Sequence, residues 1–352
     1  MKIGLQMIQS RGPRAVEIAQ QAEAAGFDGV WIADYMGEHA NYLKAALLLD
    51  ATSKLTVGTS IAPALLASPA FHAAQARFLQ ETSGGRFILG FGSQTKGQIR
   101  MELGVTPPKI AKEAREVIEV TRGILSGQPF EYEGEFQRRR GPGRRIRGEN
   151  IAPPPIFYSG VGPINLRIAG QYTDGFLSHP IFTRKYYEDV VWPEIETGLA
   201  KTDRTRADFT MVAMPMTLIL EDESERAEAM STAKRNLANY FTTHAYGTFM
   251  DMHGWTKQRE GIWAVAEAVN GNPARFDWVA LEAAMTDDIV DEVCLVGTAD
   301  EVREKATARY TGVAEYLDLY PMHDMSRASD DGPAHEFENL SRFTRAFEGF
   351  NR

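Results

Sequence analysis

The chain has 352 residues, of which 43% are hydrophobic and 24% are charged. This composition is that of a globular protein with a substantial core, and it excludes a mostly disordered chain. The formal net charge of −9 excludes the broad basic field that proteins use to hold nucleic acid or an anionic membrane surface. We therefore expect neither nucleic acid nor a membrane among the partners.

The chain contains one cysteine, Cys294. Disulfides within the chain and cysteine-cluster metal sites are therefore excluded. The first residues lack the apolar stretch of a signal peptide, and the uncharged segment 55–76 carries Pro63 and Pro69, which interrupt any membrane helix. A cytoplasmic protein is expected.

Short β-branched or aromatic segments alternate with helical patterns along the chain, which is typical of β-α units over a parallel sheet. The first strand is expected at 2–7, and the helix after it begins near Pro13 and ends at Gly26. Seven further strands are expected at 29–34, 56–61, 87–91, 155–159, 175–179, 209–219 and 315–320. Eight strands separated by helices predict a (β/α)8 TIM barrel, and a doubly wound open sheet is the alternative.

A short pattern recurs where a helix returns to a strand. Residues 24–31 (AAGFDGVW) are echoed by 169–176 (AGQYTDGF) and, in part, by 308–313 (ARYTGV). The recurrence indicates that several of these returns share one geometry.

The chain is longer than the roughly 250 residues typical of such a barrel. The surplus falls into two insertions, at about 128–154 and 221–314, and the second insertion has helical patterns. Six arginines between 138 and 147 are interpreted as part of a solvated loop, at the end of the barrel opposite the functional site. We expect a single domain over 1–352.

Function in a (β/α)8 barrel lies where strands end and helices begin. Two glycine-rich turns are expected there, at 90–93 (GFGS) and 159–163 (SGVGP). Their backbone N–H groups and the dipole of the following helix can bind phosphate, although glycine in such a turn can also serve the backbone alone. Neither turn matches a P-loop or a G-x-G-x-x-G unit.

Residues that would carry chemistry without a cofactor are scarce. The histidines, among them His39 and His179, show no H-E-x-x-H or paired-carboxylate spacing, so no metal site is expected. The chain has no G-x-S-x-G elbow, and Cys294 is interpreted as a small buried hydrophobe. Phosphate-binding turns with few acid–base pairs indicate that a bound cofactor carries the chemistry.

Four segments carry a resemblance to a known family. They are 25–31 (AGFDGVW), 58–62 (GTSIA), 83–94 (SGGRFILGFGSQ) and 296–302 (VGTADEV). With these segments the chain resembles, over nearly its whole length, the bacterial luciferase-like superfamily of flavin and deazaflavin oxidoreductases. Residues 92–96 and 253–255 are similar to the branch that uses coenzyme F420.

The resemblance implies a set of cofactor contacts. Asp34 would contact the cofactor, Ser60-Ile61 would form a non-proline cis bulge under the ring system, and Gln98 would approach the ribityl chain and phosphate. With the two glycine turns, the expected cofactor-binding residues are Asp34, Ser60, Ile61, Ser93, Gln94, Gln98, Ser159, Gly160, Val161 and Gly162. The alternative is that Ser60 and Gln98 are surface caps.

The resemblance also implies an absence. Deazaflavin sugar-phosphate dehydrogenases follow the aspartate with a catalytic histidine and carry a glutamate after strand four, where this chain has Tyr35 and Thr95. Alcohol oxidation is then disfavoured, because a base must accept the hydroxyl proton. Tyr35 and His39 are the candidate catalytic residues, as proton donors, and His179 is a candidate substrate contact; for His39 the alternative is an exposed loop histidine.

We therefore expect an oxidoreductase that transfers hydride between F420 and a small, partly apolar substrate, by reduction of an activated double bond, imine or carbonyl. The alternatives are a two-component FMN-dependent monooxygenase and a non-catalytic flavin-binding protein. The superfamily implies a homodimer, and a separate reductase or dehydrogenase would supply the reduced cofactor. The aromatic and methionine-rich run 240–255 is core by default, with a part in closing the substrate cavity as the alternative.

Overall fold

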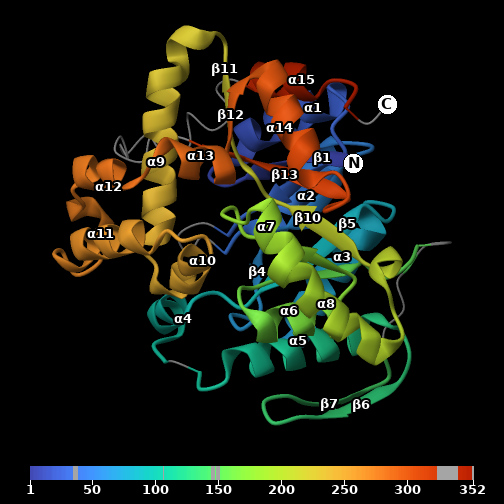
Figure 1. Ribbon diagram of the computed structural model, residues 1–352. Helices are drawn as coiled ribbons and strands as arrows, with labels where there is room; N and C mark the ends of the chain where they lie inside the picture. Colours follow the sequence, from blue (N-terminus) through green and yellow to red (C-terminus); the bar gives the residue numbers. More distant parts are fainter. Residues whose placement is uncertain (35–38, 106, 144–146, 148–150, 323–339, 351–352) are drawn as a thin grey trace.

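Eight parallel strands close into a barrel in the computed structural model, which describes residues 1–34, 39–105, 107–143, 147, 151–322 and 340–350 (Figure 1). The barrel closes because β1 pairs with both β2 and β13. The eight strands in barrel order are β1 (Lys2–Met7), β2 (Gly29–Ile32), β3 (Thr56–Thr59), β5 (Phe87–Gly92), β8 (Ile156–Ser159), β9 (Gly175–Leu177), β10 (Thr210–Ala213) and β13 (Tyr316–Pro321). The predicted (β/α)8 barrel is confirmed, and the open-sheet alternative is wrong.

Helices connect the strands, and most of them cover the outside of the barrel. The covering helices are α1 (Gly12–Ala24), α2 (Asn41–Ala51), α3 (Pro69–Thr82), α5 (Ile110–Leu125), α6 (Pro163–Tyr172), α7 (Arg184–Tyr186), α8 (Trp192–Leu199), α13 (Asp287–Val293), α14 (Ala299–Tyr310) and α15 (Leu340–Phe347). A second group stands beside the barrel in Figure 1 and is called here the helical lobe. It consists of α9 (Arg226–Phe241), α10 (Gly247–Met252), α11 (Thr256–Glu267) and α12 (Trp278–Ala284). The short helix α4 (Lys96–Leu103) follows β5 and lies near α10 in Figure 1.

Side chains of the barrel strands alternate between two apolar surfaces, as the pleat requires. The outward-facing ones, such as Leu5 and Leu89, pack with the helices into one large core. The inward-facing ones form a separate small cluster that consists of Trp31, Phe157, Leu177, Val212 and Tyr316. By the same alternation Gln6 and Asp318 face the inside of the barrel.

The recurring helix-to-strand pattern has a physical role at the N-terminal end of the barrel. Asp28, just before β2, accepts a hydrogen bond at 2.8 Å from the Ile3 amide of β1. Asp174 and Glu315 bind amides at the starts of β8 and β10 in the same way, at 2.8 and 2.7 Å. The shared geometry that the repeats predict is therefore confirmed for the returns to β2 and β9, while at β13 Glu315 lies just outside the repeat 308–313.

The segment Ser83 to Phe87, which begins one of the four segments that carry the resemblance, has a structural role. The guanidinium of Arg86 donates hydrogen bonds at 2.8 to 3.0 Å to three backbone carbonyls between residues 49 and 55. It thereby ties the end of α2 and the approach to β3 to the start of β5. Gly84 and Gly85 precede it at φ of +68° and +98°, which favours glycine at both positions.

Two expected elements differ in the structure. The strand expected at 209–219 is interrupted after β10, because Pro215 has no N–H for the ladder, and it resumes as β11 (Met216–Leu220). β11 extends past the barrel and pairs with β12 (Leu295–Thr298), a segment that the sequence indicated only as a turn. A two-residue strand, β4 (Ala62–Pro63), pairs with the end of β5.

The prediction of a loop is wrong for the first half of the first insertion. This half forms an antiparallel hairpin of β6 (Phe130–Glu133) and β7 (Arg138–Gly141). Cross-strand ion pairs explain the arginines there, since Arg138 binds Glu133 at 2.8 Å. Arg144 and Arg145 lie outside the described residues. The exposed hairpin leaves its arginines solvated, as expected.

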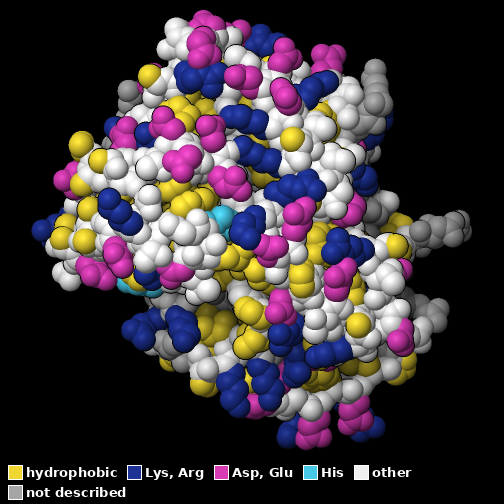
Figure 2. Space-filling model, in the orientation of Figure 1, with side chains coloured by type: hydrophobic (Ala, Val, Ile, Leu, Met, Phe, Trp, Pro, Cys, Tyr) yellow, Lys and Arg dark blue, Asp and Glu magenta, His cyan; other side chains and the backbone are white. Residues whose placement is uncertain are grey.

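The surface drawn in Figure 2 carries acidic and basic side chains interspersed, so this face has no single-sign field. Among the described residues, no helix is both long and apolar enough to cross a membrane.

Candidate active site

The polar residues predicted for the site lie at the C-terminal ends of the barrel strands. Asp34 follows β2, Ser60 follows β3 and His179 follows β9. Active sites of (β/α)8 barrels lie at this end, which is built from the loops that lead from strands to helices.

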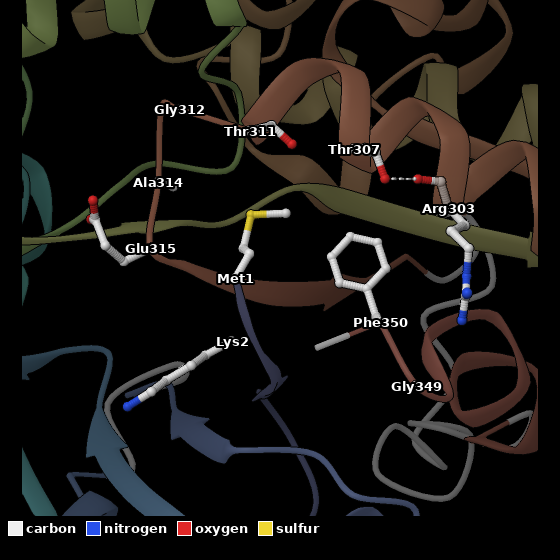
Figure 3. Close-up of a pocket in the computed structure, with 10 residues that line it drawn as sticks. All are labelled: Met1, Lys2, Arg303, Thr307, Thr311, Gly312, Ala314, Glu315, Gly349 and Phe350. Atoms are coloured by element: carbon white, nitrogen blue, oxygen red, sulfur yellow. Dashed lines mark hydrogen bonds between the residues drawn. The ribbon is translucent and has the colours of Figure 1, made fainter. Parts of the chain in front are cut away.

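A cavity of about 640 Å³ lies at the other end of the barrel (Figure 3). Its lining includes Met1 and Lys2 at the start of β1 and Glu315 just before β13. The N-terminal ends of barrel strands serve stability rather than catalysis, so this cavity is not the candidate site.

A histidine held between two carboxylates forms the centre of the candidate site. Nδ1 of His39 lies 2.7 Å from Oδ2 of Asp34, and Nε2 lies 2.9 Å from Oε2 of Glu102 on α4. The His39 amide also donates to Asp34 Oδ1 at 2.8 Å, with the backbone of His39 at φ +47°. The side chain of Asp34 is 2% exposed and that of His39 is 38% exposed. A buried carboxylate therefore holds an imidazole ring that is itself partly exposed to solvent.

The two carboxylates change the proton affinity of the ring. Burial alone would lower the pKa of His39, but the hydrogen bonds to Glu102 and Asp34 outweigh it and raise the pKa above its usual value. The pair His39–Glu102 can therefore hold a proton at neutral pH and release it to a reacting atom, which is what a general acid requires. His39 is an exposed loop residue, as the alternative expects, but both of its ring nitrogens contact carboxylates.

The position of Glu102 depends on where helix α4 begins. Thr95 and Gln98 form a capping box at this N-terminus, in which the Gln98 amide donates to Thr95 Oγ1 at 3.3 Å and the Thr95 amide donates to Gln98 Oε1 at 3.2 Å. Glu102 lies one turn after Gln98 and hence on the same side of the helix. Gln98 thus has a capping role, and its contact with a cofactor stays a prediction.

The segment after β3 carries the other candidate surface. The Ser60–Ile61 peptide bond is cis, as the resemblance implies. Its two carbonyls are held by side chains, since Gln6 Nε2 donates to Ser60 O at 3.0 Å and Asn41 Nδ2 donates to Ile61 O at 3.1 Å. Asn41 lies two residues after His39, so one short stretch of chain contacts both the bulge and the proton-holding pair.

Glycines at β5 fit closely against this bulge. A Cβ on Gly92 would lie 2.2 Å from the Ile61 side chain, and a Cβ on Gly90 would lie 2.0 Å from the Thr59 carbonyl. Both distances are impossible for real atoms, so these positions require glycine to let the bulge approach. The Oγ of Ser60 is buried there without a hydrogen-bond partner among the described residues.

A chain of hydrogen bonds joins the two glycine-rich turns. The Tyr158 hydroxyl contacts the Ser93 side chain after β5 and donates to Asn165 Oδ1 at 2.9 Å. Asn165 Nδ2 in turn donates to the Val161 carbonyl at 2.9 Å. The structure therefore brings Ser93 together with the turn 159–162. Gln94 follows Ser93 in the chain with its backbone at φ +56°, and its contact with a cofactor stays a prediction.

His179 lies apart from these groups, in an aromatic wall that includes the helical lobe. Its Nε2 is 2.7 Å from the Tyr246 hydroxyl, and its ring contacts the rings of Phe182 and Tyr240. Burial lowers the pKa of His179 to about 3, so the ring is neutral. Phe241, Phe249 and Met250 of the run 240–255 are buried, which confirms core as the default for them.

Several predictions on single residues have simple outcomes. Tyr35 lies outside the described residues. Cys294 is buried, as expected, and burial raises the pKa of its thiol to about 12. Within the described ranges no group of three or more histidine, cysteine or acidic side chains could hold a metal ion.

The model of one family, described as luciferase-like monooxygenase, matches residues 4–315. A putative coenzyme F420-dependent oxidoreductase of Mycobacterium tuberculosis is 29% identical over 323 residues, which cover 87% of this chain and 90% of that protein. The F420-dependent tetrahydromethanopterin reductase of Methanopyrus kandleri has a similar structure, with a TM-score of 0.78 and 22% identity, over 92% of this chain and 95% of that one.

A structure with FMN also shares the fold. The oxygenating constituent of 3,6-diketocamphane monooxygenase from Pseudomonas putida, in complex with FMN, gives a TM-score of 0.65 at 18% identity and covers 99% of this chain and 96% of that one. The matched family model spans most of the described barrel and its C-terminal strand ends. The chain is an enzyme of the luciferase-like monooxygenase family.

Proposed function

We propose that the protein is an F420-dependent oxidoreductase that transfers hydride between the deazaflavin and a small, partly apolar organic substrate. The observation that carries the proposal is the Asp34–His39–Glu102 cluster at the barrel mouth, two residues from the Asn41 side chain that holds the Ser60–Ile61 bulge. The similarity to a putative F420-dependent oxidoreductase supports the choice of cofactor.

The residues present fit such a cofactor. Gly90 and Gly92 leave no room for a Cβ beside the bulge, and the buried Ser60 hydroxyl has no partner among the described residues, so a ligand group can supply one. The turn Ser159–Gly162 precedes α6 with Gly162 at φ +83°, and amides in such a turn can bind phosphate. Asp34, the bulge and this turn would hold the group, which supplies or accepts a hydride when bound.

Side chains of the protein would supply the proton that accompanies hydride transfer. His39 holds a proton at Nε2 beside Glu102, and Asp34 orients the ring because it contacts both Nδ1 and the backbone amide of His39. In a reduction, this proton goes to the atom on which negative charge develops. The most direct reaction is reduction of an activated C=C, C=N or C=O group.

Under this proposal one expectation from the sequence changes. The acid–base pair is missing at the positions that the resemblance specifies, but His39 and Glu102, 2.9 Å apart, would supply one from other positions. Alcohol oxidation is therefore no longer disfavoured for lack of a base, because the deprotonated pair can accept a hydroxyl proton.

An FMN-dependent two-component monooxygenase is the second candidate, favoured by the family model and by the FMN-bound protein of the same fold. Reduced FMN activates oxygen, whereas a deazaflavin has carbon in place of N5 and reacts poorly with it. Oxygen consumption during turnover therefore distinguishes the two.

The test is a fluorescence titration of the protein with F420 and with FMN, followed by assays of the oxidation of reduced F420 with a panel of enones, imines and ketones. We expect F420 to bind and reduced F420 to be oxidised without oxygen uptake. Tight FMN binding without F420 binding would overturn the proposal, and binding of either cofactor without turnover would favour a non-catalytic flavin-binding protein.

The phosphate assignment has its own test at Gly162. A Cβ there meets no atom within 4 Å, so Gly162→Val introduces backbone strain rather than a Cβ clash, since φ +83° with ψ 160° is a conformation essentially restricted to glycine. Gly312→Val, at φ +75° and also with no atom within 4 Å of a Cβ, is the control at the N-terminal end of the barrel. We expect Gly162→Val to bind F420 more weakly than Gly312→Val, and equal affinities would remove the turn from the binding site.

We also propose a homodimer and a separate enzyme that regenerates the reduced cofactor. Leu43 and Leu47 of α2 and Phe71 and Phe78 of α3 are 49% to 70% exposed, on helices that contact each other. Apolar patches of this kind mark interaction surfaces, and a two-fold axis would bury the patch of one copy against that of another.

A further inference from the structure

His179 and His39 lie on opposite sides of the barrel mouth. His39 follows β2 and His179 follows β9, and in the eight-strand ring these two strands are separated by three strands on each side. A small substrate at the mouth therefore lies between the proton-holding pair and the aromatic wall around His179.

One ring nitrogen of His179 has a partner and the other has none. Nε2 is 2.7 Å from the Tyr246 hydroxyl, while Nδ1 is buried without a hydrogen-bond partner among the described residues. Burial raises the pKa of Tyr246, so its hydroxyl keeps its proton. The lone pair of a neutral imidazole is a better acceptor than a phenol oxygen, so Tyr246 donates to Nε2 and the ring proton of His179 sits on Nδ1.

The surroundings select the kind of group that can approach this N–H. The rings that contact His179 are Phe182, Tyr240 and Tyr246, and Tyr240 donates to the Tyr320 hydroxyl at 3.0 Å. Flat aromatic surfaces favour a planar apolar ligand, and a neutral N–H favours an uncharged acceptor over a carboxylate or phosphate.

We propose that Nδ1–H of His179 donates a hydrogen bond to the carbonyl oxygen of an α,β-unsaturated carbonyl substrate, and that Tyr246 is the positioning residue that sets this tautomer. The inference rests on the proposed function, with a reduced deazaflavin as hydride donor. Hydride adds to the β-carbon, the π electrons move onto the carbonyl oxygen beside His179, and the α-carbon takes the proton of the His39–Glu102 pair. The product is the saturated carbonyl compound.

The first test needs no cofactor. Nitrogen-15 NMR of the histidine rings, assigned with a His179→Leu variant, reports which nitrogen carries the proton. We expect the Nδ1–H form of His179 to persist between about pH 5 and 8, in contrast to an ordinary histidine, and Tyr246→Phe to give a mixture of tautomers. An Nε2–H form, or an unchanged tautomer in Tyr246→Phe, would overturn the positioning role.

The second test uses cyclohex-2-en-1-one as the probe and cyclohexene, which has no acceptor, for comparison. The probe is expected to shift the Nδ1 resonance of the intact protein and to bind about tenfold more weakly to His179→Leu, as the loss of one hydrogen bond predicts. His179→Asn keeps a donor near the position of Nδ1 and should restore part of the affinity. His244→Leu, at an exposed histidine between α9 and α10, is the matched control.

Failure of this inference and failure of the proposed function give different results. Probe binding that is absent, or equal in the intact protein and in His179→Leu, overturns the role of His179 even if reduced F420 is oxidised with other substrates. Conversely, the tautomer and probe results can hold while F420 does not bind, in which case only the cofactor assignment is wrong.

Discussion

His39 Nε2 and Glu102 Oε2 lie 2.9 Å apart, although the two residues are 63 positions apart in the sequence. The contact depends on two separate local structures. Asp34 binds both the amide and the ring of His39, and the Thr95–Gln98 capping box starts the helix that carries Glu102. The geometry of this pair therefore depends on the correct start of α4.

Replacement of Glu102 by glutamine should shift the pH dependence of catalysis. The hydrogen bond to Glu102 raises the pKa of His39, so Glu102→Gln lowers this pKa. If protonated His39 serves a reduction, activity falls as pH rises through the pKa of His39, and in the variant this fall occurs at lower pH. We expect kcat to decrease by about 10²-fold near neutral pH. A kcat–pH profile measured with reduced F420 and an enone tests both effects.

The control for this variant is Glu267→Gln. Glu267 of α11 contacts Nε2 of the exposed His244 at 3.3 Å, which makes it a second histidine–glutamate pair, separate from His39 and Glu102. Its replacement should leave the profile unchanged. A Glu102→Gln profile that coincides with that of the intact protein would show that the pair has no part in proton transfer.

The barrel could be predicted from the sequence because its signals are local. Each strand is a short apolar segment next to a helical pattern, and the acidic residues Asp28 and Asp174 recur at the same place relative to the strand. The segment 295–298 was not recognised as a strand, because its pairing with β11 depends on how far β11 extends past the barrel after Pro215.

The site was only partly predictable, for a physical reason. Asp34, Ser60-Ile61 and the glycine turns lie directly at strand ends, where position in the chain fixes position in the fold. Glu102 and Tyr246 reach their histidines from helices that are distant in sequence, so no spacing indicates them. A signal for Glu102 existed in its place one helical turn after the capping residue Gln98, but its partner could not be inferred without the fold.

Gly92→Ala should weaken cofactor binding more than the same change nearby. A Cβ at residue 92 would lie 2.2 Å from the Ile61 side chain, which would have to move and so change the shape of the bulge. At Gly97 a Cβ meets only Thr95 Oγ1, at 3.9 Å, so Gly97→Ala serves as the control. Dissociation constants for F420 from fluorescence titration compare the two. Equal constants would separate the bulge from cofactor binding.

Charges placed in the α2–α3 patch should separate the proposed dimer. Leu47 is 50% exposed and Phe78 58% exposed, so glutamate at either position is compatible with the folded monomer. In a homodimer that buries this patch, the two unpaired carboxylates of each copy would lose their hydration, which costs free energy of association.

Size-exclusion chromatography with light scattering should show dimers for the intact protein and monomers for the double variant Leu47→Glu/Phe78→Glu. Val279→Glu, at a residue of the helical lobe that is 75% exposed, should remain dimeric; monomers for the intact protein would contradict the proposal.

Asp318 should make the protein less stable as pH rises. The side chain is fully buried inside the barrel, and neither carboxylate oxygen has a hydrogen-bond partner among the described residues. Burial raises the pKa of Asp318 far above its usual value, so the folded state binds a proton that the unfolded state releases above about pH 4. The free energy of unfolding then falls as pH rises, and Asp318 contributes up to about 1.4 kcal/mol of this fall per pH unit until the folded pKa is reached.

The Asp318→Asn variant cannot ionise at this position. Its stability advantage over the intact protein in urea unfolding should therefore be larger at pH 8 than at pH 5. The exposed Asp50→Asn is the control, and an advantage independent of pH would show that Asp318 is ionised in the folded protein.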